Sequence, residues 1–296
     1  MKAGTVAVIG KANAGKSTLI NVLVGEKVAI VSPKPQTTRD RILGVLTRET
    51  HQIVFVDTPG LYRVNNALTD LMMKTTEATA KDVDAILFVV DGHTGISDDD
   101  VGRIKSYRDR GVPMLVAFTK TDIMPKENIA PNLAKIAQEA DVDVIPVSAR
   151  KGRNVRELEK AIVSLLPEGE PLYGDDVISD KSERFMIAEL MREKILLKFD
   201  QEIPHGVAIV INTFEKSETG DLYRIDLDIV CEKKNHKAIL IGKQGQALKE
   251  VSSFARKDME KFLGAKVYLT VYVKVKEDWR DKQKLIREFG YEEEEF

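Results

Sequence analysis

Residues 10–17 read Gly-Lys-Ala-Asn-Ala-Gly-Lys-Ser, which is the spacing of a loop that binds the phosphates of a nucleotide. The loop follows an apolar, β-branched stretch at residues 5–9 and leads into a helical pattern over 18–23. Main-chain N–H groups of such a loop can approach phosphate oxygens, Lys16 can reach the β and γ phosphates, and Ser17 can offer its hydroxyl to Mg²⁺. We predict that the nucleotide is held by Asn13, Ala14, Gly15, Lys16, Ser17 and Thr18.

Two further segments carry groups that can respond to a γ-phosphate. Residues 57–60 read Asp-Thr-Pro-Gly at the end of an apolar stretch, so the Asp57 carboxylate can reach Mg²⁺ and the Gly60 N–H can sense the γ-phosphate. Residues 36–40 contain two threonines, one of which we expect to complete the Mg²⁺ shell. We therefore predict a first switch at residues 36–40 and a second switch at residues 57–62.

The ends of two later strands favour guanine over adenine as the base. Residues 119–122 read Thr-Lys-Thr-Asp, and Asp122 can accept the N1–H and N2–H₂ groups of guanine, a pair of donors that adenine lacks. Ser148 and Ala149 end another predicted strand and can bring a main-chain N–H to guanine O6. The predicted base site comprises Thr119, Lys120, Asp122, Ser148 and Ala149.

The elements that must position these residues alternate strands with helices, which predicts an α/β fold with parallel strands and helical crossovers. Stretches such as residues 85–90 are apolar without alternation, so helices should cover both faces of a doubly wound sheet. Only a short turn separates the second and third strands, which predicts one antiparallel hairpin in a six-stranded, mostly parallel sheet. The predicted strands are residues 5–9, 44–49, 53–57, 85–91, 114–119 and 144–147.

A proline- and glycine-rich break at residues 167–174 predicts a domain boundary. We expect a nucleotide-binding domain at 1–168, a linker at 169–180 and a second domain at 181–296 that includes a charged tail. The second domain has the pattern of an αββααβ module. Its predicted elements include a helix around 185–195, strands at 207–213 and 222–230, a helix around 248–262 and a strand at 266–276.

A Gly-x-x-Gly sequence at residues 242–245 lies at the junction of two predicted helices of this α+β domain. In a type II KH domain, such a loop clamps four nucleotides of single-stranded RNA. Residues 233–287 contain 15 Lys or Arg and 6 Asp or Glu, an excess of +9 in a chain of net charge −2, although scattered lysines are also typical of a solvated surface. On the last predicted strand, Tyr268 and Tyr272 point away from the valines; they could stack on or contact RNA, but we favour packing in the core. The predicted RNA-binding residues are Ile241, Gly242, Lys243, Gln244, Gly245 and Lys249.

In this order the motifs resemble the translation-factor class of P-loop GTPases, and with the C-terminal module the whole chain resembles the Era family of bacterial ribosome-assembly GTPases. The resemblance implies that Thr38 is the metal-binding threonine and that Lys16, Thr38 and Gly60 act in GTP hydrolysis. It implies binding to the 3′ end of 16S ribosomal RNA, favoured by GTP, and a role in assembly of the 30S subunit. It also implies peripheral association with the inner face of the cell membrane.

Thr119 and Leu61 depart from residues that are usual in other GTPases, and each departure predicts a difference in the nucleotide site. The usual guanine motif begins with Asn where this chain has Thr119, so we expect a weaker bond between this loop and the phosphate loop. Leu61 replaces the glutamine that orients water in many GTPases, so another device must act and turnover should be slow. In related GTPases an asparagine at the position of Asn13 holds K⁺ near the phosphates; the alternative is that Asn13 only satisfies main-chain groups of the loop.

Composition limits the class of protein and leaves two rival functions. With 43% hydrophobic and 31% charged residues, the chain does not have the composition of a disordered or membrane-spanning protein. One cysteine and no signal sequence favour the cytoplasm, and we expect a monomer that does not bind DNA. The rivals are an ATP-dependent P-loop phosphotransferase and a regulatory GTPase whose second domain binds protein or membrane.

Overall fold

The computed structural model describes residues 1–61 and 66–291, and the chain divides into two compact units. Within the described residues, the first unit comprises residues 1–31, 38–61 and 72–180, and the second comprises residues 32–37, 66–71 and 181–291. The end of the predicted second switch at Tyr62 and the glutamates of the tail at 292–295 lie outside the described residues. The predicted first switch is divided between the units, because residues 36 and 37 belong to the second and Thr38 to the first.

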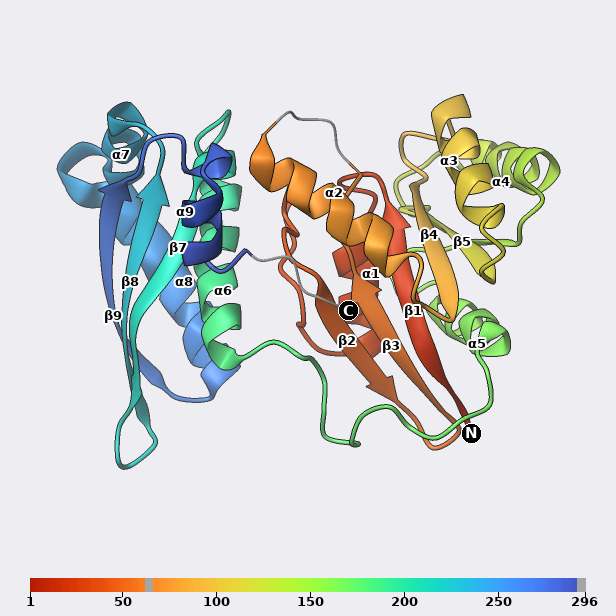
Figure 1. The fold of residues 1–296 in the computed structure, drawn as a ribbon, viewed down its shortest axis with the longest axis horizontal. Coiled ribbons are helices and arrows are strands. Elements are labelled where there is room, and N and C mark those ends of the chain that lie inside the picture. Colours follow the sequence, from red (N-terminus) through yellow and green to blue (C-terminus); the bar gives the residue numbers. More distant parts are fainter. Residues whose placement is uncertain (62–65, 292–296) are drawn as a thin grey trace. The chain divides into compact units, whose positions relative to one another are not determined.

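The first unit is built on a six-stranded sheet of order β2-β3-β1-β4-β5-β6 (Figure 1). Every neighbouring pair is parallel except β2 and β3, which form an antiparallel hairpin. The predicted six-stranded, mostly parallel sheet is thus confirmed. The strands are β1 (Lys2–Gly10), β2 (Ile42–Thr47), β3 (His51–Asp57), β4 (Ala85–Asp91), β5 (Met114–Thr119) and β6 (Val144–Pro146).

Helices cover both faces of this sheet because its central strands are apolar on both sides. On β1, Val6 and Val8 belong to a core shared with α1 and α5, whereas Ala7 and Ile9 belong to a core shared with α2, α3 and α4. This is the doubly wound arrangement that the apolar strands predict. The helices are α1 (Lys16–Val24), α2 (Ala67–Thr79), α3 (Asp98–Arg108), α4 (Lys126–Ala140) and α5 (Val155–Leu165).

The segment that we expected to be a linker is bound along the first unit. Near its start the Gly169 N–H donates to the Met1 carbonyl at 2.9 Å. Near its end the Ile178 carbonyl accepts from the Val45 N–H at 2.8 Å, and Asp180 Oδ1 accepts from the Leu43 N–H at 2.9 Å. Ile178 and Asp180 therefore bond to main-chain groups of β2, and the long C-terminal segment of the second unit begins at Lys181.

The second unit has a three-stranded sheet of order β7-β8-β9, in which β7 and β8 are antiparallel and β8 and β9 are parallel. Apolar side chains of α6 and α8 pack with those of the strands in one core. The element order is αββααβ, as predicted, followed by a short terminal helix. The elements are α6 (Glu183–Lys198), β7 (Ala208–Lys216), β8 (Leu222–Cys231), α7 (Lys234–Ile241), α8 (Gln246–Leu263), β9 (Lys266–Val275) and α9 (Gln283–Glu288), with 3₁₀ turns η1 (Pro204–Gly206), η2 (Lys243–Gly245) and η3 (Trp279–Asp281).

One expectation for this sheet is wrong. Along β9, Val267 and Val273 are buried in the core, whereas Tyr268 is 62% exposed and Tyr272 is 58% exposed. The two tyrosines therefore do not pack in the core, because the helices cover the face to which the valines point. No helix among residues 1–61 and 66–291 is both long and apolar enough to cross a bilayer.

Candidate nucleotide site and candidate RNA-binding loop

The phosphate loop connects the end of β1 to the start of α1, and its backbone explains its residue types. Gly10 approaches β4 so closely that a Cβ there would lie 2.3 Å from the Val89 carbonyl oxygen, and only glycine avoids this clash. Asn13 and Gly15 have φ values of 63° and 97°, in the left-handed region that Asn and Gly adopt most readily. The loop therefore leads into the N-terminus of α1, where main-chain N–H groups favour an anion.

Lys16 is buried inside this loop, where its Nζ donates to the carbonyl oxygens of Gly10 at 3.0 Å and Lys11 at 3.2 Å. Burial lowers the pKa of the Lys16 ammonium to about 8, although the charge of Asp57 opposes part of that effect. Among residues 1–61 and 66–291, the Lys16 ammonium contacts only carbonyl oxygens and lies near the Asp57 carboxylate, so it is well suited to receive phosphate oxygens.

The three side chains predicted to bind metal meet at one point of the first unit. The Ser17 hydroxyl donates to Asp57 Oδ2 at 2.7 Å, and Thr38 Oγ1 lies 2.9 Å from Ser17 Oγ and 3.3 Å from Asp57 Oδ2. Asp57 Oδ1 is buried and has no hydrogen-bond partner within the described part of the chain, and burial raises the pKa of this carboxyl. A cluster of oxygens with a free carboxylate oxygen fits Mg²⁺, which prefers oxygen ligands.

The start of the predicted second switch lies directly against the phosphate loop. A Cβ on Gly60 would be 2.7 Å from the Ala12 Cα, so this contact requires glycine. The next residue, Leu61, donates its N–H to the Gly10 carbonyl at 3.1 Å, and its side chain is buried in the core beneath α2, α3 and α4. The Leu61 side chain is thus part of the core, and it has no polar atom with which to orient water.

Thr119 and Lys120 connect the base side of the site to the phosphate loop. The buried Thr119 hydroxyl lies 2.6 Å from the Ala14 carbonyl oxygen and 3.0 Å from that of Val90. Lys120 Nζ donates to the Asn13 carbonyl and to Asp91 Oδ2, each at 2.6 Å. We expected threonine in place of asparagine to weaken the connection between the loops, yet in the structure its hydroxyl makes a short hydrogen bond to the phosphate loop.

Asp122 and Ser148 lie together, although they are far apart in the sequence. The Ser148 hydroxyl donates to Asp122 Oδ1 at 2.7 Å, and this bond holds the pKa of the Asp122 carboxyl below its ordinary value. The Ser148 N–H donates to the Arg153 carbonyl at 3.2 Å, so it is already used. The low pKa keeps the Asp122 carboxyl ionised, so it could accept from guanine N1–H and N2–H₂. Of the two residues predicted to donate a main-chain N–H to guanine O6, Ala149 is the better candidate.

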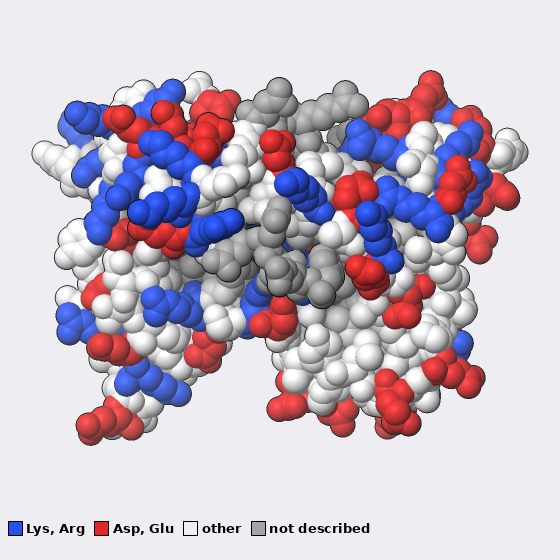
Figure 2. Space-filling model, viewed as in Figure 1, with Lys and Arg blue, Asp and Glu red and all other residues white. Residues whose placement is uncertain are grey.

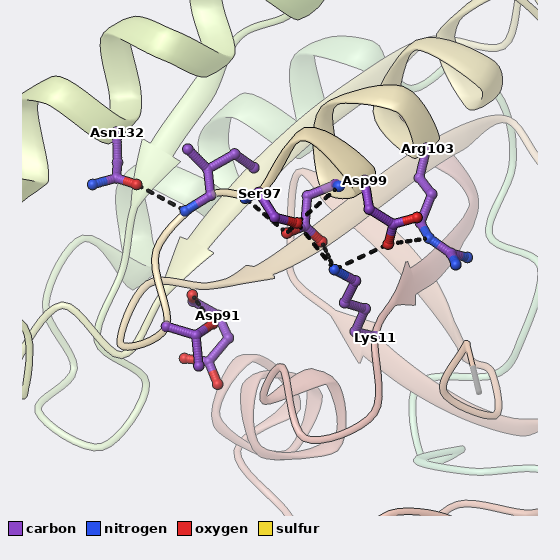
Figure 3. Close-up of polar contacts among 9 residues, drawn as sticks. Lys11, Asp91, Ser97, Asp99, Arg103 and Asn132 are labelled. Carbon is purple, nitrogen blue, oxygen red and sulfur yellow. Dashed lines mark hydrogen bonds and ion pairs between the residues drawn. The ribbon is translucent and has the colours of Figure 1, made fainter. Parts of the chain in front are cut away.

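Sequence reasoning missed an ionic cluster that binds the phosphate loop to α3 (Figure 3). Lys11 Nζ lies 2.8 Å from Asp100 Oδ1, 3.1 Å from Asp99 Oδ2 and 3.2 Å from Ser97 Oγ. Ser97 and Asp100 also form the capping box of α3. The acidic run after Ser97 was a visible sign of a helix start, but nothing in the spacing connects it to Lys11.

The Gly-x-x-Gly loop of the second unit projects at the junction of α7 and α8. Gly242, Gln244 and Gly245 all have positive φ values, and the side chains of Lys243 and Gln244 are exposed. A Cβ on Gly242 would lie 2.6 Å from the Ala247 Cβ, so the turn into α8 requires glycine there. The loop can thus bring its main chain and Lys243 close to a phosphate backbone.

Charge on the second unit is mixed. Among the six residues predicted to contact RNA, Lys243 and Lys249 are exposed cations, and Ile241, at the end of α7, is half-buried. Figure 2 shows many basic side chains near the α7 end of this unit, with acidic side chains between them. The excess of +9 is therefore not a uniform basic surface.

Comparison with known protein families agrees with this division of the chain. The family model described as a 50S ribosome-binding GTPase matches residues 5–120, and the KH domain model matches residues 202–280. Two solved structures are similar over 98% of this chain and 99% of theirs, each with a TM-score of 0.94 and 39% identity. One is a variant of Aquifex aeolicus Era bound to GDP·AlF₄⁻, and the other is Era in complex with MgGDPNP and nucleotides 1506–1542 of 16S ribosomal RNA.

Curated relatives match over the same extent. GTPase Era of Clostridium kluyveri is 44% identical over 292 residues, which cover 98% of this chain and 99% of the relative. GTPase Era of Caldanaerobacter subterraneus is 43% identical over 291 residues, which cover 98% of each. Identity of this degree over nearly the full length, with a GTPase domain and a KH domain both matched, shows that the chain belongs to the Era family of GTPases.

Proposed function

We propose that this GTPase is a switch whose second unit binds single-stranded RNA at the 3′ end of 16S ribosomal RNA and thereby assists assembly of the 30S subunit. The observation that carries the proposal is the exposed Lys243–Gln244 tip of a turn whose glycines have left-handed φ values. The solved complex of Era with a 16S ribosomal RNA fragment supports the choice of target.

For the nucleotide, the proposal assigns the phosphates to Lys16 and to main-chain N–H groups of residues 13–18. Asp122 accepts from the guanine ring and the Ala149 N–H donates to guanine O6. Ser17, Thr38 and Asp57 would hold Mg²⁺, some of them through water. When bound, the ion would neutralise charge on the β and γ phosphates.

For hydrolysis, the proposal assigns Gly60 a main-chain N–H that contacts the γ-phosphate. Because Leu61 cannot orient the attacking water, another group must help to stabilise the transition state of hydrolysis, in which charge develops on the phosphate oxygens. We place K⁺ at Asn13, whose side chain is exposed in the loop beside the phosphates. Turnover without an activator is slow in this scheme.

The same proposal has the chain acting as a cytoplasmic monomer that does not bind DNA, with peripheral association at the membrane as a secondary property implied by the family resemblance. Co-sedimentation with anionic lipid vesicles tests the membrane part, and analytical ultracentrifugation tests the monomer. Competition by duplex DNA against bound RNA tests the selectivity.

The experiment that tests the RNA assignment compares two double variants of the full chain. K243D/Q244D reverses charge at the tip of the loop and should weaken binding of a 16S 3′-end oligonucleotide more than tenfold, with GDP affinity unchanged. Q283D/K284D makes the same substitutions at an exposed Gln-Lys pair of α9 and should bind RNA like wild type. Wild-type RNA affinity in K243D/Q244D would contradict the assignment, and absence of RNA binding by wild type would favour a protein or membrane partner.

A further inference from the structure

Arg192 on α6 is buried against the main chain of the predicted first switch, and both belong to the second unit. The side chain is 1% exposed. Its Nη1 donates to the Gln36 carbonyl oxygen at 3.3 Å, and its Nη2 donates to the Thr37 carbonyl oxygen. One guanidinium thus holds the carbonyl groups of two consecutive residues directly before Thr38.

Glu189, one turn earlier on α6, orients this guanidinium. Glu189 Oε1 accepts from Arg192 Nε at 2.7 Å and Oε2 accepts from Nη2 at 2.5 Å. Glu189 is only 6% exposed, so the buried charges compensate each other. Such a two-point pair restricts the planar guanidinium to one orientation, which a lysine ammonium would not reproduce.

The same segment has other attachments within the second unit. Lys34 Nζ donates to the Phe199 carbonyl oxygen and to Asp200 Oδ1, the latter at 2.8 Å. The Gln36 side chain donates to Thr69 Oγ1 at 3.3 Å, and its φ of 58° is in the left-handed region. Residues 34–37 are therefore bound to the rest of the second unit through both side-chain and main-chain hydrogen bonds.

Thr38 follows this segment directly and belongs to the oxygen cluster of the first unit, 2.9 Å from Ser17 Oγ. Consecutive Cα atoms are only about 3.8 Å apart, so the position of the Thr37 carbonyl limits where the Thr38 side chain can lie.

We propose that Arg192 is a positioning residue for Thr38 and thereby sets the affinity for GTP relative to GDP. The inference rests on the proposed role of Thr38 at Mg²⁺ and goes beyond it by naming the second unit's residue that communicates with the nucleotide. In switch GTPases, the γ-phosphate and Mg²⁺ order the first switch, and hydrolysis releases it. Loss of Arg192 therefore weakens the GTP state and leaves the GDP state unchanged.

The test measures binding of a fluorescent non-hydrolysable GTP analogue and of fluorescent GDP to the full chain at saturating Mg²⁺, without RNA. Arg192→Met should weaken the GTP analogue about tenfold and change GDP affinity less than twofold. Arg192→Lys should restore only part of the loss, because it keeps the charge but not the two-point geometry. Arg184→Met is the matched control: Arg184 is also on α6 and donates to a main-chain carbonyl, that of Ile211, so its loss should change neither affinity.

Equal losses for the GTP analogue and GDP, unchanged affinities, or tighter binding of the GTP analogue would each overturn the proposal. If Arg192→Met leaves Glu189 buried without its partner and does not fold, the double variant E189L/R192M removes both charges and should show the same selective loss. Because no RNA is present, the outcome is independent of whether the chain binds 16S ribosomal RNA.

Discussion

Removal of the Thr119 hydroxyl by Thr119→Val should weaken both GTP and GDP by about tenfold. The Thr119 hydroxyl can donate its one proton to the carbonyl oxygen of Ala14, at 2.6 Å, or to that of Val90, at 3.0 Å. Ala14 belongs to the phosphate loop and Val90 to β4. The hydroxyl therefore fixes the loop relative to the central sheet before any nucleotide binds.

The magnitude follows from the burial of this group. Loss of the hydrogen bond removes about 1 kcal/mol of net stability, and a buried carbonyl left with one donor fewer costs about 1 kcal/mol more. We therefore expect the free energy of unfolding to fall by about 2 kcal/mol. Nucleotide binding must restore the loop to its wild-type position. If this costs about 1.4 kcal/mol of the lost stability, nucleotide affinity falls about tenfold. GTP and GDP should be affected equally because Ala14 is not part of a predicted switch.

The assay is titration calorimetry with GDP and a GTP analogue, together with urea unfolding of the free protein. Thr5→Val is the control, because the Thr5 hydroxyl also donates from the central strand β1, to Asp84 Oδ2 at 2.9 Å, but outside the nucleotide loops. This control should lose stability and keep nucleotide affinity. Wild-type affinity for both nucleotides in a folded Thr119→Val protein would show that the Thr119 hydroxyl does not hold the phosphate loop.

Three further predictions concern other parts of the two sites. Asn13→Gly keeps the left-handed backbone but removes the amide, so kcat should lose its preference for K⁺ over Na⁺; equal wild-type kcat in the two salts would reject K⁺ at this position. Burial lowers the pKa of Lys16 to about 8, and contact with phosphate must raise that pKa again. At pH 9 without Mg²⁺, the protein should therefore take up a proton when it binds GDP, and the calorimetric heat should depend on the ionisation enthalpy of the buffer. Binding without net proton uptake would argue against the lowered pKa. Gly242→Ala should destabilise the second unit more than Gly245→Ala in thermal unfolding, because only the first Cβ would clash, at 2.6 Å from Ala247 Cβ; equal losses would show that φ alone matters.

The nucleotide site was largely predictable from sequence because its parts follow strand ends. The phosphate loop, Asp57 and Asp122 each come at the end of a strand, and parallel strands present those ends on one edge of the sheet. The prediction that Ser17, Thr38 and Asp57 meet needed only this topology together with the family resemblance.

Other contacts were not predictable, because they join segments whose spacing has no periodic meaning. Lys11 meets Asp99 and Asp100, and Arg192 meets residues 36 and 37 from more than 150 positions away. In each case a short-range pattern was visible, such as the acidic first turn of α3, but its partner depends on tertiary packing.

The exposed tyrosines of β9 illustrate a limit of alternation. The pattern correctly divides Val267 and Val273 from Tyr268 and Tyr272, since alternate residues point to opposite faces. The alternation does not show whether other parts of the chain pack against the face that carries the tyrosines. The α6 and α8 side chains fill the core on the valine side, which left the prediction for the tyrosines wrong.

We expect the bound nucleotide to control how tightly this chain binds RNA. Fluorescence anisotropy of a single-stranded RNA from the 3′ end of 16S ribosomal RNA, titrated with GTP-analogue-bound and then GDP-bound protein at one fixed salt concentration, tests it most directly. RNA should bind more tightly to the GTP-analogue-bound protein than to the GDP-bound protein. Equal affinity in the two states, or binding in neither, would contradict it.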